Sequence, residues 1–211
     1  MSVIDGLTLD LGLLIDEIAV RGYCVMEQAI ATDLLDALYI EASDEVRFRP
    51  AAIGRGVDEQ LNTKVRSDEI AWMKGESEAQ QRWLAAMSAL RLEINRHLFM
   101  GLFSFECHYA HYAPGHFYKK HFDAFEGSAN RRLSVVAYLN PEWQEEWGGE
   151  LVIYDKQDRF LKRVQPKGGS VVVFLSEDFP HEVLPTQQDR FSIAGWFRVN
   201  TTHGGKIDPP R

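Results

Sequence analysis

Cysteine is scarce in this chain: only Cys24 and Cys107 occur among its 211 residues. Two cysteines are too few for the disulfide framework of a small secreted domain, and their spacing is not that of a zinc site. We therefore expect a protein whose thiols stay reduced, as they do in the cytoplasm.

Long apolar runs and an excess of positive charge are also lacking. No hydrophobic stretch reaches the roughly 18 residues of a membrane-spanning helix. The N-terminal stretch has no basic start, and Asp5, Asp10 and Asp16 interrupt its apolar residues, so it predicts an amphipathic helix rather than a signal peptide. The formal net charge of −8 argues against binding to the phosphate backbone of nucleic acids. We expect a cytoplasmic protein without membrane or nucleic-acid partners.

The front of the chain has apolar residues at helical spacing. Such spacing predicts helices at 9–20, 34–42 and 77–99. Thr32 or Asp33 is the expected N-cap of the second helix, because both side chains can accept hydrogen bonds from free backbone N–H groups.

The back of the chain is patterned for strands. After Gly101, short apolar runs alternate with turn signals such as NPEW and KGG, which predicts many short strands in a sandwich or small barrel. Between the two patterns, the segment 47–68 has little periodicity, and long loops in compact domains are usually functional or mobile. Together the two halves predict one α+β domain.

His121 and Asp123 lie two positions apart in HFYKKHFDAF. By itself an H-x-D match is weak, because chance alone gives roughly half of one in a chain of this composition. If the segment is a strand, however, both side chains point to the same face. His181 begins another expected strand after a Phe-Pro turn and is the best third ligand. Two histidines and one carboxylate form the facial triad that binds iron(II) and leaves other positions open.

Arg190 follows His181 by nine residues and opens the expected strand RFSIAGWF. A guanidinium binds a carboxylate through two parallel hydrogen bonds, so it suits the far end of a dicarboxylate cosubstrate. A tyrosine hydroxyl beside it would add a second donor.

These residues also have ordinary structural interpretations. His121 and Asp123 could form a surface ion pair, His181 could be a core histidine, and Arg190 could belong to a buried salt bridge. Tyr118, Tyr138 and Trp196 could be packing residues, because aromatic side chains are common in strands.

Taken together, the motifs resemble the 2-oxoglutarate- and iron(II)-dependent oxygenases, whose fold is a double-stranded β-helix, or jelly roll. Within that superfamily they are similar to the prolyl 4-hydroxylases of the oxygen-sensing type and their bacterial relatives. The resemblance covers roughly residues 50–200. The segments that carry it are HYAPGHFYKKHFD, RRLSVVAYLN, WGGELVIY, PHEV, RFSIAGWF and, before the jelly roll, VRSDEIAWM.

The resemblance implies three groups of site residues. The iron ligands would be His121, Asp123 and His181. The 2-oxoglutarate ligands would be Arg190 and Tyr138 at the far carboxylate, and Tyr112 at the iron-side end. The pocket for the prolyl substrate would be lined by Tyr118, Trp196 and Arg131. Arg66 and Asp68 would lie near the hinge of a lid. One departure is that the stretch between Tyr112 and His121 is one residue shorter than in the animal members.

The same resemblance implies a domain plan within a single structural unit. Its parts would be a helical support at 1–100 with a lid at about 47–68, a jelly-roll catalytic core at 101–200, and a loose tail at 201–211.

The function implied is hydroxylation at C4 of a prolyl residue in a protein, with Fe(II), 2-oxoglutarate and O2, and with ascorbate as a reductant. The bacterial relatives suggest a translation factor, elongation factor Tu, as the protein substrate. Two alternatives stay open: an oxygenase of the same chemistry that acts on a small molecule or another side chain, and a non-catalytic jelly-roll binding module. The long polar loop favours a polypeptide substrate, and the intact triad with Arg190 favours an enzyme.

Overall fold

The computed structural model describes residues 4–51, 62, 64–124 and 130–200. The helices are α1 (Leu11–Arg21), α2 (Thr32–Ile40) and α3 (Glu78–Leu98). The strands are β1 (Tyr23–Met26), β2 (Arg49–Pro50), β3 (Glu69–Trp72), β4 (Leu102–Tyr112), β5 (Tyr118–His121), β6 (Arg131–Tyr138), β7 (Leu151–Tyr154), β8 (Phe160–Val164), β9 (Val171–Leu175), β10 (His181–Val183) and β11 (Arg190–Val199). Much of the expected lid, residues 52–61 and 63, and the whole tail at 201–211 lie outside the described residues.

Helices α1 and α3 begin and end where their capping residues allow. Asp10 accepts a hydrogen bond from the Leu13 N–H at 3.1 Å, and Gly22 ends α1 at a φ of 77°. Ser77 accepts from the Gln80 N–H at 3.1 Å at the start of α3. Both helices were predicted from their apolar spacing. No helix in the described part of the chain is long and apolar enough to cross a membrane.

Helix α2 was predicted in the right place but with the wrong cap. Its N-cap is Ala31, which has no side-chain hydrogen bond, while Thr32 and Asp33 are already helical. At its far end a π-helical turn, Glu41–Glu45, prolongs the element. The burial of Leu34 and Leu38 against the core anchors this helix, since its first turn lacks a capping side chain.

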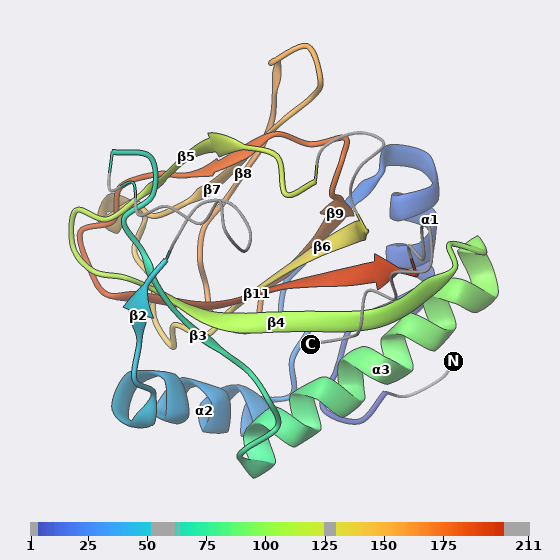
Figure 1. The fold of residues 1–211 in the computed structure, drawn as a ribbon, viewed down its shortest axis with the longest axis horizontal. Coiled ribbons are helices and arrows are strands. Elements are labelled where there is room, and N and C mark those ends of the chain that lie inside the picture. Colours follow the sequence, from blue (N-terminus) through green and yellow to red (C-terminus); the bar gives the residue numbers. More distant parts are fainter. Residues whose placement is uncertain (1–3, 52–61, 63, 125–129, 201–211) are drawn as a thin grey trace, which may run out of the picture.

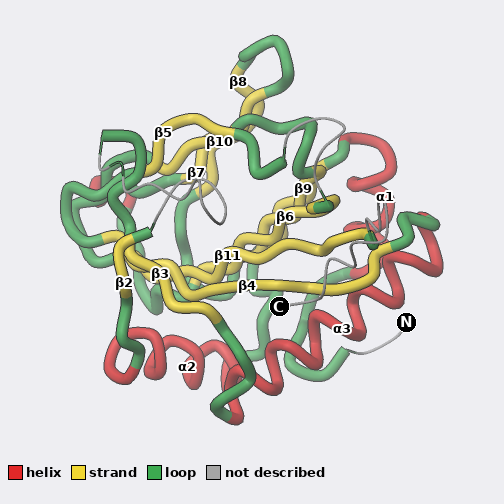
Figure 2. The backbone as a smooth tube through the Cα atoms, in the orientation of Figure 1, coloured by secondary structure: helices red, strands yellow, loops and turns green. Residues whose placement is uncertain are grey.

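The strands form two antiparallel sheets. The major sheet has the order β1-β9-β6-β11-β4-β3-β2, and the minor sheet has the order β5-β10-β7-β8. Figures 1 and 2 show the minor sheet on one side of the major sheet and helices α2 and α3 on the other. This α+β jelly roll confirms the expected fold. Strands β1, β2 and β3 come from the front of the chain yet belong to the major sheet.

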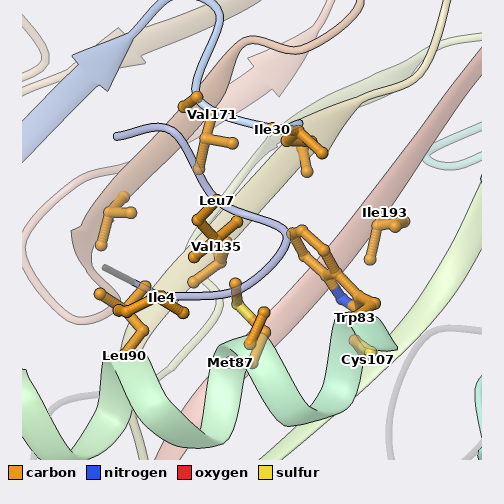
Figure 3. Packing of buried hydrophobic residues seen from close by; sticks show 14 of the residues in the cluster. Ile4, Leu7, Ile30, Trp83, Met87, Leu90, Cys107, Val135, Val171 and Ile193 are labelled. Atoms are coloured by element: carbon orange, nitrogen blue, oxygen red, sulfur yellow. The ribbon is translucent and has the colours of Figure 1, made fainter. Parts of the chain in front are cut away.

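Alternation along the central strands separates two hydrophobic clusters. One face of the major sheet packs against the helices, where Figure 3 shows Trp83, Met87 and Leu90 of α3 beside Val135 and Ile193. Burying each such large apolar side chain contributes roughly 1.5–3 kcal/mol to folding. The opposite face packs against the minor sheet. The residues of that second cluster include Tyr112, Tyr138, Ile153, Phe174 and Val183.

Candidate active site

Three metal-binding side chains meet where β5 and β10 pair. His121 is the last residue of β5 and stands opposite His181, the first residue of β10. The donor atoms of His121, Asp123 and His181 all lie within 4.8 Å of one another. The spacing of His121 and Asp123 suggested that both lie on one strand, and this prediction is wrong. Strand β5 ends at His121, and Asp123 reaches the cluster from the bend that follows.

Hydrogen bonds to backbone carbonyls orient both imidazoles. His121 Nδ1 lies 2.8 Å from the Lys119 carbonyl oxygen, and His181 Nδ1 lies 3.1 Å from that of Phe179. A carbonyl oxygen can only accept, so each Nδ1 donates and each Nε2 keeps a free lone pair. The two Nε2 atoms are 3.7 and 3.6 Å from the carboxylate oxygens of Asp123. All three residues thus direct their donor atoms to one point, as metal ligands do.

The carboxylate of Asp123 is held in place from the major sheet. Ser134 Oγ donates a hydrogen bond of 2.6 Å to Asp123 Oδ2 and lies 2.9 Å from Ser176 Oγ. Burial works against ionisation of Asp123, but His181 and His121 together hold its pKa below the usual value. This arrangement keeps a charged, oriented ligand at the centre of the cluster.

The protonation of His121 also suits a metal. Burial, reinforced by His181, lowers the pKa of His121 to about 3, so its ring is neutral at pH 7. Metal binding requires a neutral imidazole and an ionised carboxylate. Two nitrogen donors and one oxygen donor match the facial triad of iron(II) oxygenases. The residues present therefore fit an iron(II) ion.

Arg190 opens β11 and is 1% exposed. Its Nε donates to the Gly149 carbonyl at 2.8 Å, and its Nη1 donates to Ser192 Oγ at 3.0 Å. Among the described residues no carboxylate forms an ion pair with it. A buried charge without a counter-ion is costly, so the guanidinium suits an anionic ligand better than a structural salt bridge.

Two tyrosines lie beside this arginine. The centre of the Arg190 guanidinium is 4.8 Å from the Tyr112 ring and 5.2 Å from the Tyr138 ring. The Tyr138 hydroxyl is buried and lies close to the Arg190 guanidinium. Burial raises the pKa of Tyr138 to about 12, so it keeps its proton as a donor. Arg190 and Tyr138 together offer the donors that a buried carboxylate of 2-oxoglutarate would need.

Tyr118 connects the metal cluster to the segment before β3. Its ring stacks on His121 with centroids 3.5 Å apart, and the Arg66 guanidinium lies 4.6 Å from the same ring. Arg66 binds both carboxylate oxygens of the buried Asp68, at 2.6 and 2.9 Å. These contacts bring together the three residues Tyr118, Arg66 and Asp68 that the sequence could only relate by resemblance.

Arg131 and Trp196 form a second group beside the site. The Arg131 guanidinium lies 3.5 Å from the centre of the Trp196 ring, within the range of a cation–π contact. The Trp196 indole N–H is buried without a hydrogen-bond partner among the described residues. A free donor in a buried setting suits a ligand with a carbonyl oxygen.

Glu106 was missed by sequence reasoning, as was Arg198. Glu106 Oε1 accepts from Nε and Nη2 of Arg131 at 3.0 and 2.9 Å, and Oε2 accepts from Arg198 Nη1 at 3.2 Å. The carboxylate thus holds Arg131 over the Trp196 ring. Strand alternation could have found it, because Glu106 shares the face of β4 that carries Tyr112.

Trp72 on β3 extends this group further. It stands opposite His108 in the β3–β4 ladder, with ring centroids 5.1 Å apart, and lies 6.4 Å from Trp196. Burial lowers the pKa of His108 to about 3, so this ring is a neutral packing partner. The sequence left Trp72 unassigned because an aromatic in a strand is most often structural.

The sequence and fold of this chain are similar to those of known oxygenases. The 2OG-Fe(II) oxygenase superfamily profile matches residues 107–198. The chain is 40% identical to a crystallised prolyl-4-hydroxylase of Pseudomonas putida, covering 89% of this chain and 98% of that one with a TM-score of 0.81. The fold also matches a prolyl hydroxylase of Trichoplax adhaerens, solved in complex with a hypoxia inducible factor oxygen degradation domain peptide fragment. That match has 22% identity, coverage of 89% of this chain and 88% of the other, and a TM-score of 0.78.

Among curated proteins, prolyl 3-hydroxylase OGFOD1 of Xenopus laevis is 35% identical over 101 residues, or 43% of this chain. The match spans only 18% of the frog protein, which is therefore much longer than this chain. The bacterial likeness extends over nearly the whole chain, whereas the likeness to OGFOD1 is confined to a part.

Proposed function

Because this chain belongs to the prolyl 4-hydroxylase family of 2OG-Fe(II) oxygenases, we propose that it hydroxylates C4 of a prolyl residue within a protein. The geometry that carries the proposal is the convergence of His121, Asp123 and His181, with donor atoms within 4.8 Å. These residues would hold the iron(II) ion. Iron(II) and 2-oxoglutarate, when bound, supply the chemistry in which O2 oxidises a C–H bond to a hydroxyl while 2-oxoglutarate becomes succinate and CO2.

The chain's own contribution is to bind and orient the reactants. Arg190 would pair with the far carboxylate of 2-oxoglutarate, and the Tyr138 hydroxyl would donate to the same group. Tyr112, whose ring lies beside the Arg190 guanidinium, would reach the iron-side end of the cosubstrate. No side chain is required to act as a general acid or base in this scheme.

The prolyl residue would be held between the two aromatic groups. Tyr118 lies against His121, so it would form the wall nearest the iron. Trp196 and Arg131 would form the opposite wall, where the free indole N–H could bind a backbone carbonyl of the substrate. Arg66 and Asp68 would anchor the lid that excludes water during the reaction. We expect this reaction to take place in the cytoplasm.

The relatives support position C4 and a protein substrate. The prolyl-4-hydroxylase of Pseudomonas putida matches 89% of this chain at 40% identity, while the prolyl 3-hydroxylase match covers 43% of it. The Trichoplax enzyme was solved with a peptide bound, which supports a polypeptide substrate here. Elongation factor Tu is the substrate that we propose to test first.

The decisive experiment is mass spectrometry of purified elongation factor Tu after incubation with this protein, iron(II), 2-oxoglutarate, ascorbate and air. We expect one added oxygen on a single proline, with a matching amount of succinate. The Asp123→Ala variant serves as the blank. Amino-acid analysis of the modified peptide against 3- and 4-hydroxyproline standards identifies the carbon.

Other outcomes point elsewhere. Succinate without a modified proline would keep the oxygenase chemistry and reject elongation factor Tu, so that a cell lysate or small-molecule panel would be searched next. Iron binding without succinate under any condition would favour the non-catalytic jelly-roll module. Omitting ascorbate tests the expected reductant, since turnover should then decline with time.

A further inference from the structure

A cavity of about 770 Å³ lies beside β3, where the edge of the major sheet meets the helices. The π-helical turn contributes Glu41 to its lining, and the start of α3 contributes Ser77 and Gln80. The lining residues are Glu41, Val46, Arg47, Arg49, Pro50, Ile70, Ala71, Trp72, Lys74, Glu76, Ser77, Gln80 and Tyr109. None of the proposed iron or 2-oxoglutarate ligands lines it.

The cavity rim is basic, although the chain as a whole carries a net charge of −8. Arg47, Arg49 and Lys74 are exposed, and among the described residues no carboxylate forms an ion pair with any of them. Of the two acidic lining residues, Glu41 is buried and accepts hydrogen bonds from Ser77 and Gln80. Glu76 alone presents an exposed carboxylate. The rim therefore has positive charge available for a ligand.

The backbone beside the cavity is also available. Strand β2 has two residues and pairs only with Glu69 and Ile70 of β3. Within the described residues, Ala71 and Trp72 have a ladder partner on the β4 side alone. An open strand edge can accept an extended peptide as an additional strand, in which main-chain hydrogen bonds give affinity and side-chain pockets give specificity.

Trp72 joins this cavity to the proposed prolyl site. Trp72 is 39% exposed and lines the cavity, and its ring lies 6.4 Å from the Trp196 ring, which in turn lies under Arg131. A polypeptide whose proline occupies the Trp196 end would continue over Trp72 toward the basic rim.

We propose that this cavity binds the segment of the substrate polypeptide that flanks the target proline, and that this segment is acidic. The occupant pairs its carboxylates with Arg47, Arg49 and Lys74 and extends along the open edge of β3. This inference rests on the proposed prolyl hydroxylation for its substrate, and it adds a charge requirement that none of the site residues imposes.

Binding of synthetic peptides tests the charge requirement separately from catalysis. Each peptide has about 20 residues, long enough to span both sites when extended, with one central proline in an Ala/Ser background. The set comprises peptides with three glutamates before or after the proline, a glutamine version and a lysine version. Fluorescence anisotropy measures their affinity for the wild-type protein and for the charge-reversed variant Arg47→Glu/Arg49→Glu/Lys74→Glu.

A matched control separates local from general charge effects. Arg21→Glu/Arg96→Glu/Lys162→Glu reverses the same residue types at positions that do not line the cavity. One glutamate peptide should bind the wild-type protein about tenfold more tightly than the glutamine peptide, with the advantage falling as salt rises. The cavity variant should lose that preference, and the control variant should retain at least most of it.

Three results of the binding assay would overturn the proposal: equal affinity for the glutamate and glutamine peptides, equal loss in both variants, or no binding of any peptide. Mass spectrometry of the same peptides with iron(II), 2-oxoglutarate and air keeps the two proposals apart. Hydroxylation that is indifferent to flanking charge would reject the acidic segment and keep the prolyl reaction. A charge-dependent affinity at the cavity without hydroxylation would keep the acidic site and reject the prolyl reaction.

Discussion

The two faces of the major sheet are built from the same strands but differ in almost every chemical respect. On β4, Cys107 and Tyr109 face the helices, whereas Glu106, His108 and Tyr112 face the site. The helix face is an apolar core. The site face carries charged side chains and hydroxyl groups, among them Glu106, Arg190 and Tyr138. The contrast teaches that folding depends on one face and chemistry on the other, so substitutions on the two faces should separate stability from activity.

Loss of a metal ligand should have the largest effect on activity. Asp123→Ala and His181→Ala should each abolish iron(II) binding and lower turnover by more than about 100-fold, because the remaining two donors cannot hold the ion. Anaerobic titration calorimetry with iron(II) measures the binding. His97→Ala, at a half-exposed histidine on α3, is the control and should bind normally. Full iron binding by either ligand variant would contradict the assignment.

Removal of the buried arginine should disable the cosubstrate site while sparing the fold. In Arg190→Met the KM for 2-oxoglutarate should rise about 100-fold, a loss of roughly 3 kcal/mol that is typical of a buried charge-assisted pair. The free energy of unfolding should fall by no more than about 1 kcal/mol, because an uncompensated buried charge is removed as well. A large loss of stability with an unchanged KM would instead show that Arg190 is structural.

A substitution that creates a cavity in the core on the helix face should lower stability and leave cosubstrate binding unchanged. Leu90→Ala removes a fully buried side chain and should lower the free energy of unfolding by about 2–5 kcal/mol in urea denaturation. At low temperature the folded variant should retain the wild-type KM for 2-oxoglutarate. The exposed neighbour Leu92, substituted in the same way, should change stability by less than about 0.5 kcal/mol. Comparable losses of stability in Leu90→Ala and Leu92→Ala would contradict the assignment of the folding core to the helix face.

Glu106→Gln should have the smallest and most selective effect. A neutral amide holds the Arg131 and Arg198 guanidinium groups less firmly, so Arg131 should shift from the Trp196 ring. We expect a several-fold higher KM for a prolyl substrate, about 1 kcal/mol, with an unchanged KM for 2-oxoglutarate. Glu17→Gln, which weakens the surface pair with Arg21, is the matched control. Equal changes in both KM values would indicate general distortion.

Sequence reasoning reached the residues that local pattern or family motif could mark. The helix at 77–99 and the strand that begins at Arg190 have clear periodicity, and His121, Asp123 and His181 lie in recognisable motifs. Glu106 was missed because its role depends on the register that sets Trp196 opposite Glu106 in the β4–β11 ladder. No single segment contains that information.

Other differences have local physical causes. Strand β5 ends at His121, and the bend that follows brings the Asp123 carboxylate to Ser134 of the major sheet. At α2, Thr32 could cap, but the helix starts one residue earlier because burial of Leu34 and Leu38 fixes its position. Tertiary packing decided both points, and packing is not visible in a short window of sequence.

Strand β11 has a consequence for how such an enzyme can diversify. Arg190 and Trp196 lie on one face of this strand, six residues and therefore about 20 Å apart. The strand would hold the proposed cosubstrate anchor, Arg190, and the proposed substrate-binding residue, Trp196, at a fixed separation. Evolution or design could replace the target-reading end by point substitutions without retuning the oxidising end, whereas an inserted residue would turn one of the two ends away from the site.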